Sequence, residues 1–240
     1  MAKNIFKILA VFIIGTVGGI FAEQILWPYF IERPLFYKYK LEQTPVYVTE
    51  RKEITNYIQE NVALKEAAEK VLKTIVGVKT KTQEGEVLTG SGLIVTNDGF
   101  LVTLADLIPQ GSDFAFYVDG KWPEYQVLKR DSRNNLALVK VGAGGFHTAG
   151  FADLEKIKLG ERVFLAGFDF ASTSPRLMVN EGVIKIFDKD IIQTNIVETS
   201  LVNGSPLFNI EGNVVGLSFL SADGRVFAIP VTKIRTLAGY

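Results

Sequence analysis

The chain has 240 residues, of which 48% are hydrophobic and 22% are charged, so it can bury a core as one domain or two lobes, and global disorder is excluded. Its 26 basic residues balance 26 acidic residues, which argues against a nucleic-acid partner held by bulk positive charge. There is no cysteine and a single histidine, His147. Disulfides, thiolate nucleophiles, iron–sulfur clusters, zinc ribbons and histidine-rich metal sites are therefore excluded, and we expect no cofactor or metal.

An apolar stretch near the N-terminus predicts a membrane anchor in residues 1–27. Ile8–Ala22 carries no charge, and apolar residues extend it on both sides. Because a helix rises about 1.5 Å per residue, roughly 20 such residues cross the hydrocarbon core. A cleaved signal peptide is the competing interpretation, but Ile20 is large where a cleavage site after Ala22 needs a small residue. We therefore expect an uncleaved span that contacts the membrane through residues 5–27.

Charge alone does not decide the orientation of this span. Two lysines precede the span, and three basic residues follow it within about 15–20 residues, the distance over which the positive-inside rule applies. The rule therefore gives no clear asymmetry. Gly15 and Gly19 form a motif that can pair helices in membranes. A homo-oligomer is therefore compatible with the sequence.

Residues 28–57 predict a connector, because Pro28, Pro34 and Pro45 forbid a continuous helix. From about Glu60 the pattern becomes helical. Apolar residues then recur at spacings of three and four: Leu64, Ala68, Val71, Leu72 and Ile75. Such a stripe predicts a short amphipathic helix that packs on the domain that follows.

After Ile75 the pattern changes to short β-rich runs separated by turn signals, of which Asn97-Asp98-Gly99 is a typical hairpin turn. We expect strands at Ser91–Thr96, Phe100–Thr103, Phe114–Val118, Glu124–Leu128, Leu136–Val141, Val163–Gly167, Val179–Ile186, Ile191–Thr194, Val214–Leu220 and Arg225–Ile229. Many short strands with no long helix between them predict an all-β fold, either a sandwich or a pair of barrels.

Five segments, in order, resemble the protease domain of HtrA-type, trypsin-like serine peptidases. They are Ser91–Ile108, Asn134–Val141, Ile192–Asn209, Glu211–Ser218 and Val226–Pro230. The resemblance covers the chain from roughly Ala67 to its end. It implies two six-stranded antiparallel β-barrels in a domain of residues 58–240, with lobes at about 75–142 and 158–237. It also implies an active site in the cleft between the barrels.

Such a peptidase needs a serine nucleophile, a histidine base and an aspartate that orients the histidine. Carried over by the resemblance, the histidine position falls on Asp106, the aspartate position on Asn135 and the serine position on Asn203. The histidine position therefore lacks an imidazole, the aspartate position lacks the orienting carboxylate, and the serine position lacks a hydroxyl. The loop that stabilises the oxyanion in the family is also altered. Leu201 replaces a glycine two residues before Asn203, and Gly204 directly follows Asn203.

Two alternatives stay open at this point. Ser205 or Ser200 could act as a nucleophile in a rearranged site, although no motif supplies a base, and His147 is expected in an exposed loop between the barrels. Asp106 and Asn203 could also hydrogen-bond to each other across the former cleft, because a carboxylate and an amide are complementary.

The sequence thus predicts a membrane-anchored trypsin-like pseudoprotease that binds or scaffolds a peptide or protein partner in the cell envelope. An extended peptide would bind in the retained groove by strand addition. The family's usual PDZ module is expected to be absent, because Tyr240 follows closely after the last matched segment. The resemblance favours a single-pass protein of the cell membrane with its C-terminal domain outside the cytoplasm. A serine endopeptidase with a rearranged site, and a purely structural anchor with a filled cleft, are the competing functions.

Overall fold

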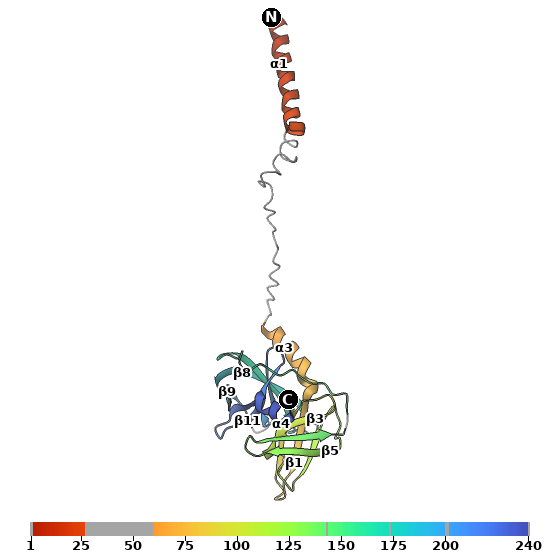
Figure 1. Cartoon of the computed structure of the whole chain (residues 1–240), viewed down its shortest axis with the longest axis vertical. Coiled ribbons are helices and arrows are strands. Elements are labelled where there is room, and N and C mark those ends of the chain that lie inside the picture. Colours follow the sequence, from red (N-terminus) through yellow and green to blue (C-terminus); the bar gives the residue numbers. More distant parts are fainter. Residues whose placement is uncertain (1, 27–59, 143, 173, 200–201, 240) are drawn as a thin grey trace. The chain divides into compact units, whose positions relative to one another are not determined.

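The computed structural model describes residues 2–26, 60–142, 144–172, 174–199 and 202–239 (Figure 1). The chain divides into two compact units, Met1–Tyr57 and Ile58–Tyr240. The connector expected at 28–57 and the residues Ser200 and Leu201 lie outside the described residues. Each unit is taken by itself below.

The first unit contains an apolar helix. Helix α1 (Ala2–Phe21) continues into a π-helical turn, η1 (Ala22–Leu26). Its apolar side chains are exposed, and the segment Lys3–Leu26 is long and apolar enough to cross a membrane. The Thr16 hydroxyl donates back to the carbonyls of Phe12 and Ile13, both at 3.0 Å, so this polar group is satisfied within the helix. The helix has the length and composition of a membrane anchor or of a signal sequence.

The second unit opens with the predicted amphipathic helix, α3 (Glu60–Val71), followed by a 3-10 turn, η3 (Leu72–Thr74). Val71 and Ile75 of the predicted apolar stripe are buried, and so is Ala67, which the predicted stripe does not include. Lys70 Nζ donates to the carbonyl of Glu211 at 3.0 Å. The helix therefore packs on the part of the domain that follows it, as its pattern predicts.

The first six strands form one antiparallel sheet in the order β4-β1-β2-β3-β6-β5. The strands are β1 (Ile75–Lys81), β2 (Val87–Ile94), β3 (Phe100–Leu104), β4 (Asp113–Tyr117), β5 (Tyr125–Asp131) and β6 (Leu136–Val141). Side chains join the two edge strands, because the rings of Phe114 and Tyr125 lie 4.9 Å apart and those of Phe116 and Tyr125 lie 5.2 Å apart. The sheet thus curls into a barrel that aromatic contacts close.

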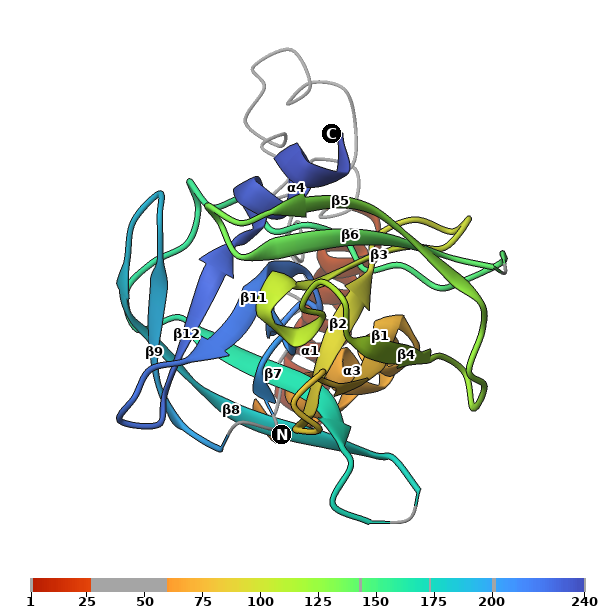
Figure 2. The same cartoon turned by 90° about the horizontal axis from the view of Figure 1, so that it is seen from below.

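The last six strands form a closed antiparallel barrel in the order β10-β11-β12-β9-β8-β7, seen end-on beside the first sheet in Figure 2. They are β7 (Arg162–Asp169), β8 (Arg176–Phe187), β9 (Ile192–Val197), β10 (Pro206–Asn209), β11 (Val214–Leu220) and β12 (Arg225–Pro230). One buried cluster runs through both sheets and includes Phe164 and Phe208, whose rings stack at 5.3 Å. The fold that the resemblance implied is therefore confirmed.

Three elements were not predicted from local pattern. Strand β1 continues an apolar run from the preceding helix, so its period is ambiguous. Strand β10 has only four residues and begins at Pro206, which usually argues against a strand. Helix α4 (Val231–Ala238) buries Val231, Ile234 and Leu237, and ends at Gly239 with φ +89°.

Candidate active site

Asp106 and Asn135 form a reciprocal pair in the first barrel. Strands β3 and β6 pair Leu104 with Leu136, so the residues after and before these strands are neighbours. The Asn135 amide nitrogen donates to Asp106 Oδ2 at 2.8 Å, and the Asp106 backbone N–H donates to Asn135 Oδ1 at 3.0 Å. The register of the sheet therefore brings together two of the three positions predicted from the resemblance.

The turn before β6 holds Asn135 in place. Asp131 Oδ1 accepts the backbone N–H groups of Arg133 and Asn134, both at 3.1 Å, and Asp131 Oδ2 accepts the Asn134 amide at 2.7 Å. The hydrogen bond from the Asn134 side chain is the main cause that holds the pKa of Asp131 below its ordinary value. Asn135 itself has φ +52°, a conformation that asparagine adopts more readily than most residues.

Asn203 joins strands of both barrels. Its side-chain Oδ1 accepts the Leu220 backbone N–H at 3.0 Å, and its backbone carbonyl accepts the Ser91 N–H at 2.9 Å. The hypothesis of a direct Asp106–Asn203 hydrogen bond is therefore wrong. Each of the two side chains has instead a partner supplied by the local register, Asn135 for Asp106 and Leu220 for Asn203.

Ser205, the alternative nucleophile, is fully buried with 0% exposure. Its backbone N–H donates to the Val202 carbonyl at 3.0 Å. A Cβ built on Gly167 would lie 2.1 Å from Ser205 Oγ, so the hydroxyl is enclosed by β7. Within the described residues, Ser205 Oγ and the Oγ of buried Ser218 have no hydrogen-bond partner. Ser205 is thus neither accessible to a substrate nor bonded to a base.

We expect Ser205→Ala to leave the domain as stable as before or to stabilise it by up to about 1 kcal/mol, because the change removes a buried hydroxyl without a partner. The measurement is the midpoint of chemical unfolding. Thr194→Val is a matched control, since the buried Thr194 hydroxyl donates to the Val226 carbonyl at 2.9 Å and its loss should destabilise by about 1 kcal/mol. A marked loss of stability in Ser205→Ala would show that this hydroxyl has a partner.

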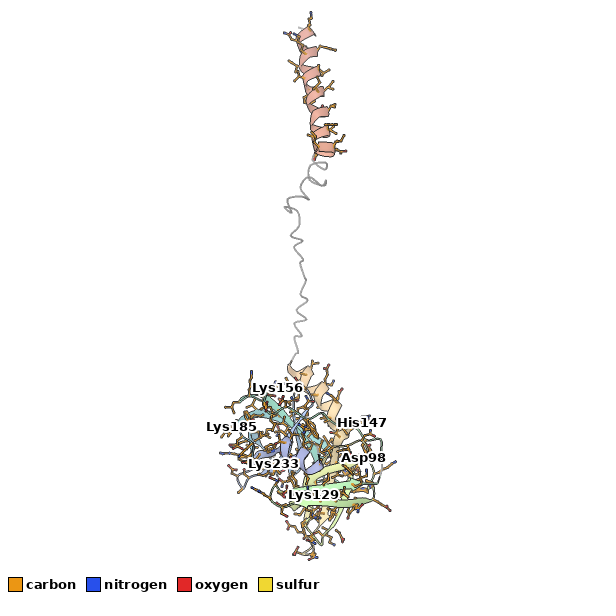
Figure 3. All side chains as sticks on the ribbon, in the orientation of Figure 1. Asp98, Lys129, His147, Lys156, Lys185 and Lys233 are labelled. Atoms are coloured by element: carbon orange, nitrogen blue, oxygen red, sulfur yellow. The ribbon has the colours of Figure 1, made fainter. Side chains whose placement is uncertain are left out.

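His147 is exposed, as expected for a loop histidine, and Figure 3 labels its side chain. Its neighbours Gly145 and Phe146 donate backbone N–H groups to the Asn97 carbonyl at 3.0 and 3.1 Å. Asn97 precedes β3 and Asp106 follows it. The single imidazole therefore lies at the opposite end of β3 from Asp106 and cannot replace the missing base.

A pocket of ≈ 220 Å³ opens beside Asn135, between the two barrels. Its lining comes from the first barrel, the second barrel and helix α4: Arg133, Asn134, Asn135, Asp190, Ile191, Phe219, Ile229 and Lys233. Lys233 Nζ bridges to Asp190 Oδ1 at 3.1 Å on one wall. A purely structural anchor is expected to have a junction that side chains fill, whereas this junction holds an open pocket. In the described part of the chain, no three His, Asp or Glu side chains cluster as metal ligands would.

With this geometry in view, the comparisons with known proteins define the class. The family model for the trypsin-like peptidase domain matches residues 90–217, and the chain belongs to this family. A probable periplasmic DegP-like serine endoprotease of Rhizobium meliloti is 33% identical over 159 residues, which cover 60% of this chain and 31% of that protein. The serine protease HTRA1 of Xenopus laevis is 30% identical over 166 residues, which cover 64% and 36%.

A solved structure shares the fold. An HtrA-type protease crystallised with a tripeptide superposes with a TM-score of 0.65 and 21% sequence identity, over 73% of this chain and 62% of that one. The matched region spans only 31% to 36% of the length of the curated relatives named above. The similarity therefore concerns the peptidase domain, and the activities of the whole relatives do not transfer with it.

Proposed function

We propose that this protein is a membrane-anchored, HtrA-type pseudoprotease that binds or scaffolds a peptide or protein partner in the cell envelope. The observation that carries the proposal is the Asn135–Asp106 pair, in which an amide and a carboxylate bond to each other at 2.8 Å where the family has an aspartate and a histidine. A carboxylate is a weaker base than an imidazole, and a neutral amide accepts no proton near neutral pH.

The nucleophile position supports the same proposal. Asn203 has no hydroxyl, and its amide oxygen is already bonded to Leu220. Removing either the nucleophile or the base lowers turnover on the order of 10⁶-fold in a serine protease. The barrel pair and the pocket beside Asn135 support a binding role, because a partner could bind at the junction of the barrels without hydrolysis.

The apolar helix and the printed descriptions of the relatives support the cellular location. Lys3–Leu26 is long enough to span the membrane, and several similar proteins are described as periplasmic. In the proposed topology the N-terminus lies in the cytoplasm, and the C-terminal domain lies outside the cytoplasm in the cell envelope. The anchor then confines the domain to partners near the membrane surface.

We expect the full-length chain in detergent micelles to show no labelling by a fluorophosphonate probe and no cleavage of casein. The matched variant is the triple change Asp106→His, Asn135→Asp and Asn203→Ser, which restores the three family residue types and should gain labelling. Labelling of the unaltered chain that disappears in Ser205→Ala would overturn the proposal and identify a serine hydrolase with a rearranged site.

A further inference from the structure

Strand β11 extends beyond its neighbour in the closed barrel. On one side it pairs with β12 from Gly216 to Leu220, but on the other side its register with β10 ends where Leu217 meets Pro206. Ser218 and Leu220 therefore project backbone groups past the start of β10. A strand edge that extends past its neighbouring strand can take up an extended peptide as an additional strand where its backbone groups are free.

The loop before β10 occupies this edge. Ser218 N–H donates to the Ser205 carbonyl at 2.8 Å, and Gly204 N–H donates to the Ser218 carbonyl at 2.7 Å. Leu220 N–H, the next group along the same edge, donates to the Asn203 side chain at 3.0 Å. The first two bonds join backbone to backbone, whereas the third depends on which residue stands at position 203.

Asn203 is held by its backbone and not only by its side chain. Its carbonyl accepts the Ser91 N–H of β2 at 2.9 Å, and a Cβ built on Gly90 would come within 2.4 Å of that carbonyl oxygen. The backbone of Asn203 is therefore fixed between the barrels. A change of side-chain rotamer would free Leu220 without moving the strand.

We propose that the Asn203 side chain is an internal competitor for the β11 edge. Its amide oxygen takes the position at Leu220 that a carbonyl of an extended peptide would occupy, so a peptide pairs with Leu220 only after the side chain has rotated away. This inference rests on the proposed function, because it assigns the partner as an extended peptide segment and names the residue that controls its access. The asparagine at position 203 then occupies the β11 edge and also leaves this position without a hydroxyl.

The first test is hydrogen–deuterium exchange of the Leu220 amide in the full-length chain in micelles, read by mass spectrometry of fragments that separate residues 219 and 220. The unaltered chain should protect this amide. In Asn203→Ala, which removes the acceptor, exchange should be about tenfold faster, since one hydrogen bond is worth about a factor of ten. In the matched control Asn203→Asp, a side-chain oxygen remains in the same place and protection should persist.

The second test measures binding of fluorescein-labelled casein, an unfolded protein, by fluorescence anisotropy. Asn203→Ala should bind casein about tenfold more tightly than the unaltered chain. In this variant no hydrogen bond between residue 203 and Leu220 has to break before the peptide can pair with Leu220. Asn203→Asp should bind as the unaltered chain does. An unprotected Leu220 amide in the unaltered chain, or equal casein affinity in all three proteins, would overturn the inference. Failure of the pseudoprotease proposal is distinguished by a separate measurement, because the unaltered chain would then be labelled by the fluorophosphonate probe.

Discussion

Gly204→Ala is expected to destabilise the peptidase-type domain by about 2–5 kcal/mol. Gly204 has φ +75°, and a Cβ built there would lie 2.2 Å from the Ser91 carbonyl oxygen. The left-handed conformation costs a non-glycine residue roughly 1–2 kcal/mol, and the clash with a backbone atom adds a cost of overpacking of about 1–3 kcal/mol. In a domain of this size we expect the melting temperature to fall by about 10 °C.

Gly85→Ala is the matched control. Gly85 has φ +88°, but nothing lies within 4 Å of a Cβ built on it. This variant should therefore lose only the conformational part, about 1 kcal/mol and roughly 3 °C. Equal losses in the two variants would mean that the loop before β10 is not pressed against Ser91, and the close contact between the barrels at Asn203 would then be in doubt.

The second large effect concerns the apolar helix. We expect the double change Ile13→Arg and Val17→Arg to move the full chain from the membrane fraction to the soluble fraction. Both positions lie in the middle of Lys3–Leu26 and are exposed. An arginine near the centre of a spanning helix costs about 2.5–3.5 kcal/mol, so two together should abolish insertion. Fractionation followed by immunoblotting measures the outcome.

The control Ile13→Leu with Val17→Leu keeps the helix apolar and should stay in the membrane fraction. The intact mass of the membrane-bound protein distinguishes an anchor from a signal sequence, since the anchor retains its residues before Glu23. A soluble product of the unaltered chain that begins near Glu23 would contradict the anchor and with it the proposed attachment to the membrane.

The three positions carried over from the family, Asp106, Asn135 and Asn203, are all bonded within the domain. Asp106 and Asn135 satisfy each other, and Asn203 is bonded to strands of both barrels. The loop at Asn203 contributes to the junction between the barrels, which is why the substitutions at Gly204 and Asn203 are expected to affect stability and peptide access in different ways.

Local pattern was sufficient for much of the fold. The apolar period over Lys3–Leu26, the helical stripe that begins near Glu60, and most strands could be predicted because each depends on residues close in sequence. The framework segments also identified the barrel pair and named the positions Asp106, Asn135 and Asn203. Short or ambiguous elements escaped, such as β10, which is stable only because β7 and β11 pair with it on both sides.

The sequence by itself determined which chemical groups stand at the three positions carried over from the family, a carboxylate at Asp106 and amides at Asn135 and Asn203. Only the tertiary structure decided which of them meet. The Asn135–Asp106 pair joins residues 29 positions apart and the Asn203–Leu220 bond joins residues 17 positions apart. Both contacts depend on strand register and on the direction of each side chain, as does the burial of Ser205. These quantities are set by long-range packing, which no local spacing of residues encodes.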